Sequence, residues 1–174
     1  TVFAVAVASG GTVYAGGSFA TAGGVPAAGI ARWDGSAWSP LGGGLNNYVD
    51  ALAVAPDGTV YAGGDFTTAG GAPASRIARW DGSAWSALGD GANIRVDALA
   101  VAPDGDLYAG GLFTTAGGAP ASRIARWDGT AWSALGAGAS GPVYALAFDA
   151  YGDLALGGFF STAGGVYSPN IALY

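Results

Sequence analysis

The sequence predicts an all-β fold, a β-propeller built from repeated four-stranded blades. The same pattern returns every 47 residues without a gap, starting at Val2, Val49, Val96 and Val143. Each copy contains four short apolar runs separated by turn residues, which is the pattern of one antiparallel sheet. Four strands in roughly 40–50 residues is the size of one propeller blade. Helices are a poor alternative, because Gly or Pro recurs every few residues and each interior Gly costs a helix about 1 kcal/mol relative to Ala.

The repeat divides the chain into blades at residues 2–48, 49–95, 96–142 and a shorter 143–174. The second and third copies agree at 39 of 47 positions, which makes the period certain. The fourth copy ends inside its third predicted strand, so we expect the last blade to lack its outermost strand. A length of 174 residues suits a single domain, residues 1–174.

The second copy shows the elements most clearly, with strands predicted at residues 49–55, 59–64, 76–80 and 83–88. Pro56-Asp57-Gly58 closes the first strand, since Pro presets φ and Gly accepts a positive φ. A longer connection, 65–75, joins the second strand to the third. Asp81-Gly82 is a hairpin signal between the third and fourth strands. A two-residue loop there places Trp80 opposite Ser83, with Trp80 and Trp85 diagonal on one face.

Side-chain size follows the taper of a propeller blade, which is narrow near the axis and broad at the rim. The first two strands are rich in Ala and Gly and read as nearly continuous apolar runs, as expected for sheets buried on both faces. The bulky Trp residues fall in the third and fourth strands, where we expect them to pack between blades. The residues predicted to be structural are Trp33, Trp38, Trp80, Trp85, Trp127, Trp132, Gly63, Gly64, Gly110 and Gly111.

An apolar strand ending in Gly63-Gly64, followed by Trp80 and then Trp85, resembles the kelch-type propeller repeat, also seen in the central domain of galactose oxidase-like proteins. The run 76–89 looks still more like repeats of bacterial secreted and cell-surface propellers of mostly unassigned function. Two departures from kelch are the Trp at position 80, where Tyr is typical, and a tighter spacing to Trp85. The resemblance implies a blade scaffold in which the glycines and tryptophans are structural. It brings over no copper site, because that site needs His and Cys.

Missing residue types exclude several kinds of chemistry. The chain contains no His, Cys or Lys. Ser-His-Asp and Cys-His nucleophiles and the usual zinc and haem sites are therefore excluded, as are P-loops and Schiff bases. A net charge of −6 disfavours nucleic acid as a partner, and no apolar run is long enough for a membrane span. We expect no cofactor, no metal and no enzymatic activity.

The acidic residues leave one catalytic alternative open. Asp50 and Asp97 open the first strand of their copies, where a central channel would begin. They could be solvated or turn-capping carboxylates, members of a cation-binding ring, or the acids of a glycoside hydrolase or lyase. Phe3 and Tyr144 occupy the same position in the first and fourth copies, which argues against a complete cation-binding ring.

Three arginines recur one residue before the first Trp of each complete copy: Arg32, Arg79 and Arg126. We expect them to hydrogen-bond or stack between blades. Binding of an anionic ligand is the alternative.

Loop lengths predict which end of the propeller binds. Turns alternate between the two ends of an antiparallel blade, so the short turns share one end, the short-loop face. The connection between strands two and three and the link to the next blade share the other, the long-loop face. Differences between the copies concentrate partly there, and loops on a rigid scaffold often contain binding residues. The expected ligand-binding residues are Asn46, Asn47, Tyr48, Asp65, Asp90, Asn93 and Arg95. The alternative is that these loops only connect the strands and that their sequences vary without a role in binding.

These observations favour a non-enzymatic binding or structural scaffold, extracellular or on a bacterial-like cell surface, with a protein or carbohydrate ligand. A lectin is one form of it, although the Trp residues are better explained as packing. Near-identical copies are also expected of a chain that was engineered, or cut from a longer protein, for studies of propeller assembly. An exposed edge on the last blade invites pairing with another chain. We therefore expect two chains to share an eight-bladed ring, or the sequence to belong to a longer array, with a closed four-bladed monomer as the alternative.

Overall fold

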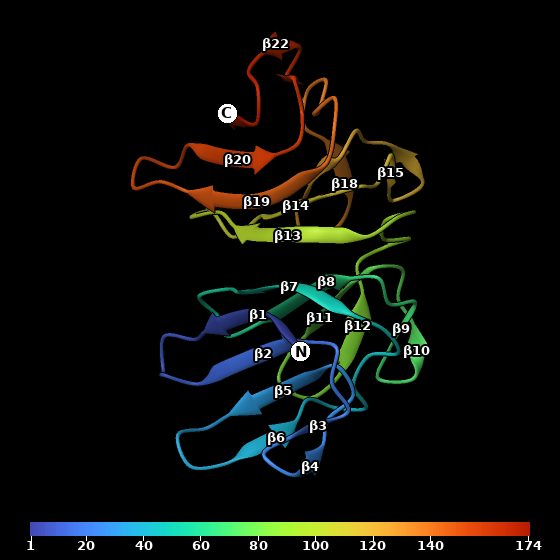
Figure 1. Cartoon of the computed structure of the whole chain (residues 1–174), viewed down its shortest axis with the longest axis vertical. Helices are drawn as coiled ribbons and strands as arrows, with labels where there is room; N and C mark the ends of the chain where they lie inside the picture. The colour runs from blue at the N-terminus through green and yellow to red at the C-terminus, as the bar shows by residue number, and fades with distance from the viewer.

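The computed structural model describes residues 1–174 as a row of four antiparallel sheets, one from each repeat (Figure 1). The first sheet contains β1 (Val2–Val7), β2 (Val13–Gly17), β5 (Ile30–Trp33) and β6 (Trp38–Pro40). The second contains β7 (Val49–Val54), β8 (Val60–Gly64), β11 (Ile77–Trp80) and β12 (Trp85–Ala87). The third contains β13 (Val96–Val101), β14 (Leu107–Gly111), β17 (Ile124–Trp127) and β18 (Trp132–Ala134). The fourth has only three strands: β19 (Val143–Phe148), β20 (Leu154–Gly158) and β23 (Ile171–Leu173).

The strands of every sheet are ordered as they occur in the chain, and the predicted all-β blade architecture is confirmed. The first strands of successive blades pack in a row, with β7 between β1 and β13, and β13 between β7 and β19. Figure 1 shows the first and last blades at opposite ends of the longest axis. No helix that could cross a bilayer is present.

Each long connection contains a two-stranded hairpin that was not predicted. The four hairpins are β3 (Thr21–Ala22) with β4 (Val25–Pro26), β9 (Thr68–Ala69) with β10 (Ala72–Pro73), β15 (Thr115–Ala116) with β16 (Ala119–Pro120), and β21 (Thr162–Ala163) with β22 (Val166–Tyr167). Gly70 and Gly71 form the two-residue loop of the second hairpin, both with positive φ (59° and 85°). Two positive φ values are what a type I′ turn requires, and a Gly-Gly pair supplies them without strain.

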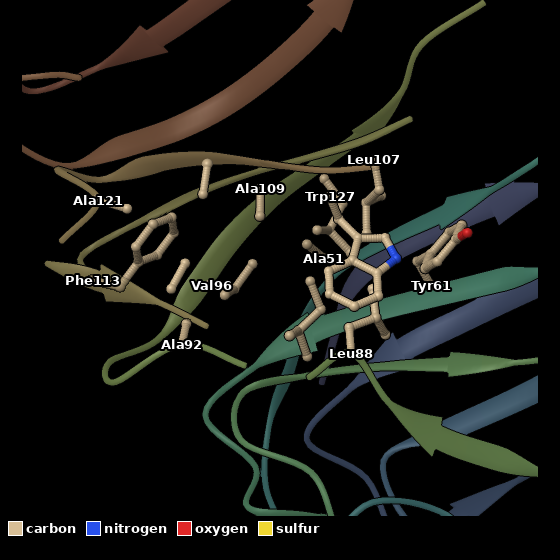
Figure 2. Packing of buried hydrophobic residues seen from close by; sticks show 14 of the residues in the cluster. Ala51, Tyr61, Leu88, Ala92, Val96, Leu107, Ala109, Phe113, Ala121 and Trp127 are labelled. Carbon is tan, nitrogen blue, oxygen red and sulfur yellow. The ribbon is translucent and has the colours of Figure 1, made fainter. Parts of the chain in front are cut away.

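The hydrophobic core is divided into three clusters, each between two successive blades. Between the second and third blades, Ile77 and Leu88 pack with Val96, Leu107 and Phe113. Figure 2 shows this cluster, with the Trp127 ring beside Leu88 and directed towards Tyr61. The other two clusters reuse the equivalent positions. Each core therefore needs residues from two blades, so no blade buries its faces alone.

The double glycine at the end of each second strand serves two different contacts. A Cβ on Gly63 would lie 2.6 Å from Cγ1 of Val96 in the next blade. A Cβ on Gly64 would lie 2.0 Å from the carbonyl oxygen of Tyr48, beside the register shift between Val49 and Ala51 in its own blade. The first glycine therefore lets the next blade approach closely. The second lets the irregular start of the first strand pass close to the end of the second strand in the same sheet.

The predicted hairpin register of the Trp pair is wrong by two residues, because Trp80 pairs with Trp85 and not with Ser83. Trp80 and Trp85 lie directly opposite each other rather than diagonally, with ring centroids 5.6 Å apart. The loop has four residues because Oδ1 of Asp81 accepts hydrogen bonds from the backbone N–H groups of Ser83 (2.8 Å) and Ala84 (2.9 Å). These bonds and that from the Ser83 hydroxyl lower the pKa of Asp81 to about 2, since they stabilise the ionised carboxylate.

The second Trp of a hairpin also joins its blade to the blade before it. Nε1 of Trp85 donates to the carbonyl oxygen of Leu41 (2.9 Å), and Nε1 of Trp132 donates to that of Leu88 (2.7 Å). The indole therefore buries its rings and satisfies its only donor at the same interface.

We expect Gly63→Ala to destabilise the protein by about 2 kcal/mol, because the added methyl group meets the fully buried Val96. Urea unfolding followed by Trp fluorescence measures the change. Gly10→Ala is the matched control and should change stability by less than about 0.5 kcal/mol, since a Cβ there meets nothing within 4 Å. In the double variant Gly63→Ala, Val96→Ala, the smaller neighbour removes the clash, so the two costs should not add. Strict additivity would contradict the proposed contact.

Candidate ligand-binding face

The long-loop face is a continuous layer in which every link between blades pairs with the following blade. Isolated β-bridges join Leu45 to Ala69, Ala92 to Ala116 and Ala139 to Ala163. In each case, the link that leaves one blade contacts the small hairpin of the next. The loops predicted to bind a ligand are thus held to one another by backbone pairing.

Two residues predicted to bind a ligand form a clamp between blades. Oδ1 of Asn46 accepts from the backbone N–H groups of Thr67 (2.8 Å) and Thr68 (3.0 Å), and its Nδ2 donates to Oγ1 of Thr67 (2.9 Å). Asn93 repeats all three bonds on residues 114–115. One Asn side chain therefore satisfies two backbone donors of the next blade, much as a helix cap does.

Ser140 takes over the clamp in the third link. Its Oγ accepts from the backbone N–H groups of Ser161 and Thr162, at 3.0 Å each. The side chain differs from Asn, but the two backbone bonds are kept. The change from Asn to Ser between the copies therefore keeps the same structural contact.

A hollow of about 730 Å³ lies between the long connection of the first blade and the first link, and it includes Asn46, Asn47 and Tyr48. The Tyr48 side chain is about half exposed, and the Phe3 ring packs edge-on against it with centroids 6.0 Å apart. Oδ1 of Asn47 accepts from the backbone N–H of Tyr48 (2.9 Å). The hollow therefore combines an aromatic surface with amide groups.

The other four predicted residues lie in three further places, one of them next to Tyr48, whose carbonyl oxygen accepts from the backbone N–H of Asp65 (3.0 Å). Asp90 and Asn93 line a smaller hollow of about 300 Å³ between the second and third blades. Asp65 pairs with Arg76 (3.4 Å), and Arg95 pairs with Asp97 (2.6 Å). The seven residues do not form one site.

Asp50 and Asp97 begin adjacent inner strands and are only partly exposed. Burial raises the pKa of both carboxyl groups, and the positive charge of Arg95 opposes the shift. Oδ2 of each is buried without a hydrogen-bond partner. No group of three or more metal-ligating side chains is present, and neither Asp lines any of the three main hollows.

Two of the three recurring arginines, Arg79 and Arg126, form their polar side-chain contacts within their own blades rather than between blades. Nε of Arg79 donates to Oγ of Ser86 on the neighbouring strand (3.1 Å). Arg126 forms an ion pair with Asp106 of the same blade. The reason is register: Arg79 lies directly opposite Ser86, so the nearest polar group is in the same sheet.

Comparison with known families finds a match to a β-propeller domain of unknown function, DUF5122, at residues 55–80 and 102–127. These two segments cover the same part of the second and third repeats. The match supports a propeller repeat of this type. No curated protein matches the chain.

Among solved structures, the extracellular domain of the one-component system BT4673 from B. thetaiotaomicron matches 99% of this chain, with a TM-score of 0.61 and 13% identity. U3-55K matches 91%, with a TM-score of 0.60 and 14% identity. A catalytically inactive virginiamycin B lyase from Staphylococcus aureus, solved with quinupristin, matches 89%, with a TM-score of 0.55 and 15% identity. This chain spans 21%, 46% and 48% of their respective lengths. At these identities the likeness shows the fold alone.

We expect Asn93→Ala to lower the free energy of unfolding by about 1–2 kcal/mol, because two backbone donors lose their acceptor. Urea denaturation measures the loss. Asn93→Ser is the matched control and should retain most of the stability, since Ser140 forms the same two bonds in the third link. Equal losses for Ala and Ser would show that the clamp contributes little.

We expect Asp50→Asn to raise the free energy of unfolding at pH 7 by up to about 1 kcal/mol, because it removes a half-buried charge whose Oδ2 has no partner. The Asp50 pKa is higher in the folded state, so the wild type gains stability as pH falls through that pKa. The advantage of Asn should therefore shrink in acid and vanish below about pH 4, the ordinary range of Asp. Thermal unfolding at several pH values tests this. Asp57→Asn, in an exposed turn, should show no such dependence; an advantage of Asp50→Asn that is independent of pH would refute the assignment.

Proposed function

We propose that this chain is a non-enzymatic β-propeller scaffold that binds a ligand, protein or carbohydrate, on its long-loop face. The observation that supports this most strongly is the hollow of about 730 Å³ between the first blade and the first link. Binding sites for small molecules and cofactors commonly measure about 300–1,000 Å³. The hollow also lies on the end of the molecule where the copies differ most.

The chemistry of the hollow favours the lectin form of this proposal. A sugar ring offers an apolar face and a rim of hydroxyl groups. The exposed Tyr48 ring suits the apolar face, and Asn47 and Ser18 offer polar groups for the hydroxyls. The Trp residues are less suitable, because Trp85 is buried and Trp85 and Trp132 use their indole N–H groups between blades.

An extracellular or cell-surface location belongs to the same proposal, as does the kelch-like character of the repeat. A bacterial extracellular sensor domain is among the similar folds. A ligand-binding scaffold outside the cell would meet glycans and protein surfaces directly.

An Asp-dependent hydrolase or lyase is the second candidate. The raised pKa of Asp50 and Asp97 is the observation that favours it, because a proton donor must keep its proton near neutral pH. A panel of glycosidase and lyase substrates tests it. Turnover that is lost in Asp50→Asn would establish the enzyme and overturn the scaffold.

Tyr48→Ala should abolish binding on a glycan array or weaken it at least tenfold, because the stacking surface of the hollow is lost. Tyr151→Ala is the matched control, since Tyr151 is an exposed Tyr in the β19–β20 turn on the short-loop face. Its binding should equal that of the wild type. Loss of binding in Tyr151→Ala alone would place the ligand on the other face, and binding of protein probes but no glycan would favour a protein ligand.

A further inference from the structure

Each of the three interfaces between blades uses the same contact, a valine packed on a bare glycine. Val49, Val96 and Val143 open the first strands of the later blades and are fully buried. Their Cγ1 atoms lie 2.6–2.7 Å from an ideal Cβ on the first glycine of the preceding blade. The glycines are, in order, Gly16, Gly63 and Gly110. This valine-on-glycine contact sets how closely two blades approach.

The two halves of a fourth such contact are present at opposite ends of the molecule, and neither has a partner. Val2 is the equivalent valine in the first blade and is 52% exposed. Gly157 is the equivalent glycine in the last blade, and the only atom within 4 Å of a Cβ there is that of Ala145 in the same blade, at 3.5 Å. The valine and the glycine therefore both face solvent.

A second residue of the interface shows the same contrast. Ile30, Ile77 and Ile124 each pack against the following blade and are fully buried. Ile171 is their equivalent in the last blade and is 67% exposed. The outer face of the last blade therefore presents the residues of a normal interface without the blade that would cover it.

The end blades are more apolar at these faces than the inner blades. In the last blade, the exposed Tyr144 stands where the inner blades have Asp50 and Asp97, and the exposed Leu173 stands where they have the recurring arginine. Val5 and Val7 of β1 are also exposed. A blade face that stays in contact with solvent is normally polar. These faces have the opposite composition, as expected of surfaces that meet a partner.

We propose that a second copy of this chain covers both faces, with the first blade of each copy packing on the last blade of the other. Two copies form two such contacts related by a two-fold axis, so the ring closes with eight blades. Propellers commonly have four to eight blades. The contact joins the faces of sheets, with Val2 of one copy on the partner's Gly157, and does not depend on pairing at the edge strand β23.

Multi-angle light scattering of the purified chain should give twice the chain mass of 16.8 kDa. Val2→Asp should raise the dimer dissociation constant at least a hundredfold, because the dimer would bury two new charges. Val166→Asp is the matched control: Val166 is exposed on β22, away from the proposed contact, and the variant should remain dimeric. A monomeric wild type, or an open ladder of larger assemblies, would overturn the proposal.

Cysteine pairs provide a test that does not depend on affinity, since the chain has no cysteine of its own. In the internal pair Gly110→Cys, Val143→Cys, the Cβ atoms would lie 3.1 Å apart, slightly closer than the usual 3.5–4.5 Å of a disulfide. Oxidation should link this pair within one chain. The pair Val2→Cys, Gly157→Cys should instead link two chains, giving a double-mass band on a non-reducing gel. Internal linkage without linkage between chains would refute the shared ring.

Discussion

The close packing of a valine on a glycine between successive blades determines much of the architecture. A glycine without a Cβ lets the first strands of two blades approach closely, as at Gly63 and Val96. Paired Trp rings occupy the third and fourth strands. Small residues on one side and large residues on the other give each blade a wedge shape. A stack of wedges curves around its narrow side. The curvature of the row of sheets therefore follows from the difference in side-chain size.

Hydrogen bonds fix the parts of each blade that apolar packing leaves undetermined. Asp81 and its equivalents hold the outer hairpin turn, and Asn46 and its equivalents hold each link on the next hairpin. These bonds use side-chain oxygens on backbone N–H groups, so Asn and Ser are interchangeable in the clamp. The long-loop face can therefore vary in sequence while its backbone stays in place. That combination suits a surface on which binding residues change.

The repeat and the blades could be predicted from the sequence, because their causes are local or periodic. Turn residues mark every strand, and the 47-residue period aligns equivalent positions. The register of the Trp hairpin was missed because Asp81 bonds two backbone N–H groups and widens the loop. The small hairpin was missed although Gly70-Gly71 is a turn signal, since its strands are only two residues long.

The roles of residues on the long-loop face were harder to predict, because their partners lie far away in the sequence. Asn46 bonds residues 21 and 22 positions later, in another blade. An exposed Asn in a variable loop looks the same in the sequence whether it binds a ligand or the next blade. Only the packing of blades separates Asn46, which is committed to the clamp, from Asn47 and Tyr48, which face the hollow more freely.

The two proposals have a joint consequence for binding strength. In a ring of two copies the two-fold axis runs along the central channel, so both long-loop faces lie on the same end. The hollow lined by Asn47 and Tyr48 would then occur twice on one surface. Two weak sites held in a fixed arrangement can bind a repeated ligand far more tightly than either site alone, by factors of roughly 10²–10⁴. A hollow of modest affinity is therefore sufficient for a glycan-coated surface, where copies of the same sugar lie close together. Ring closure would in this way supply avidity that the single hollow lacks.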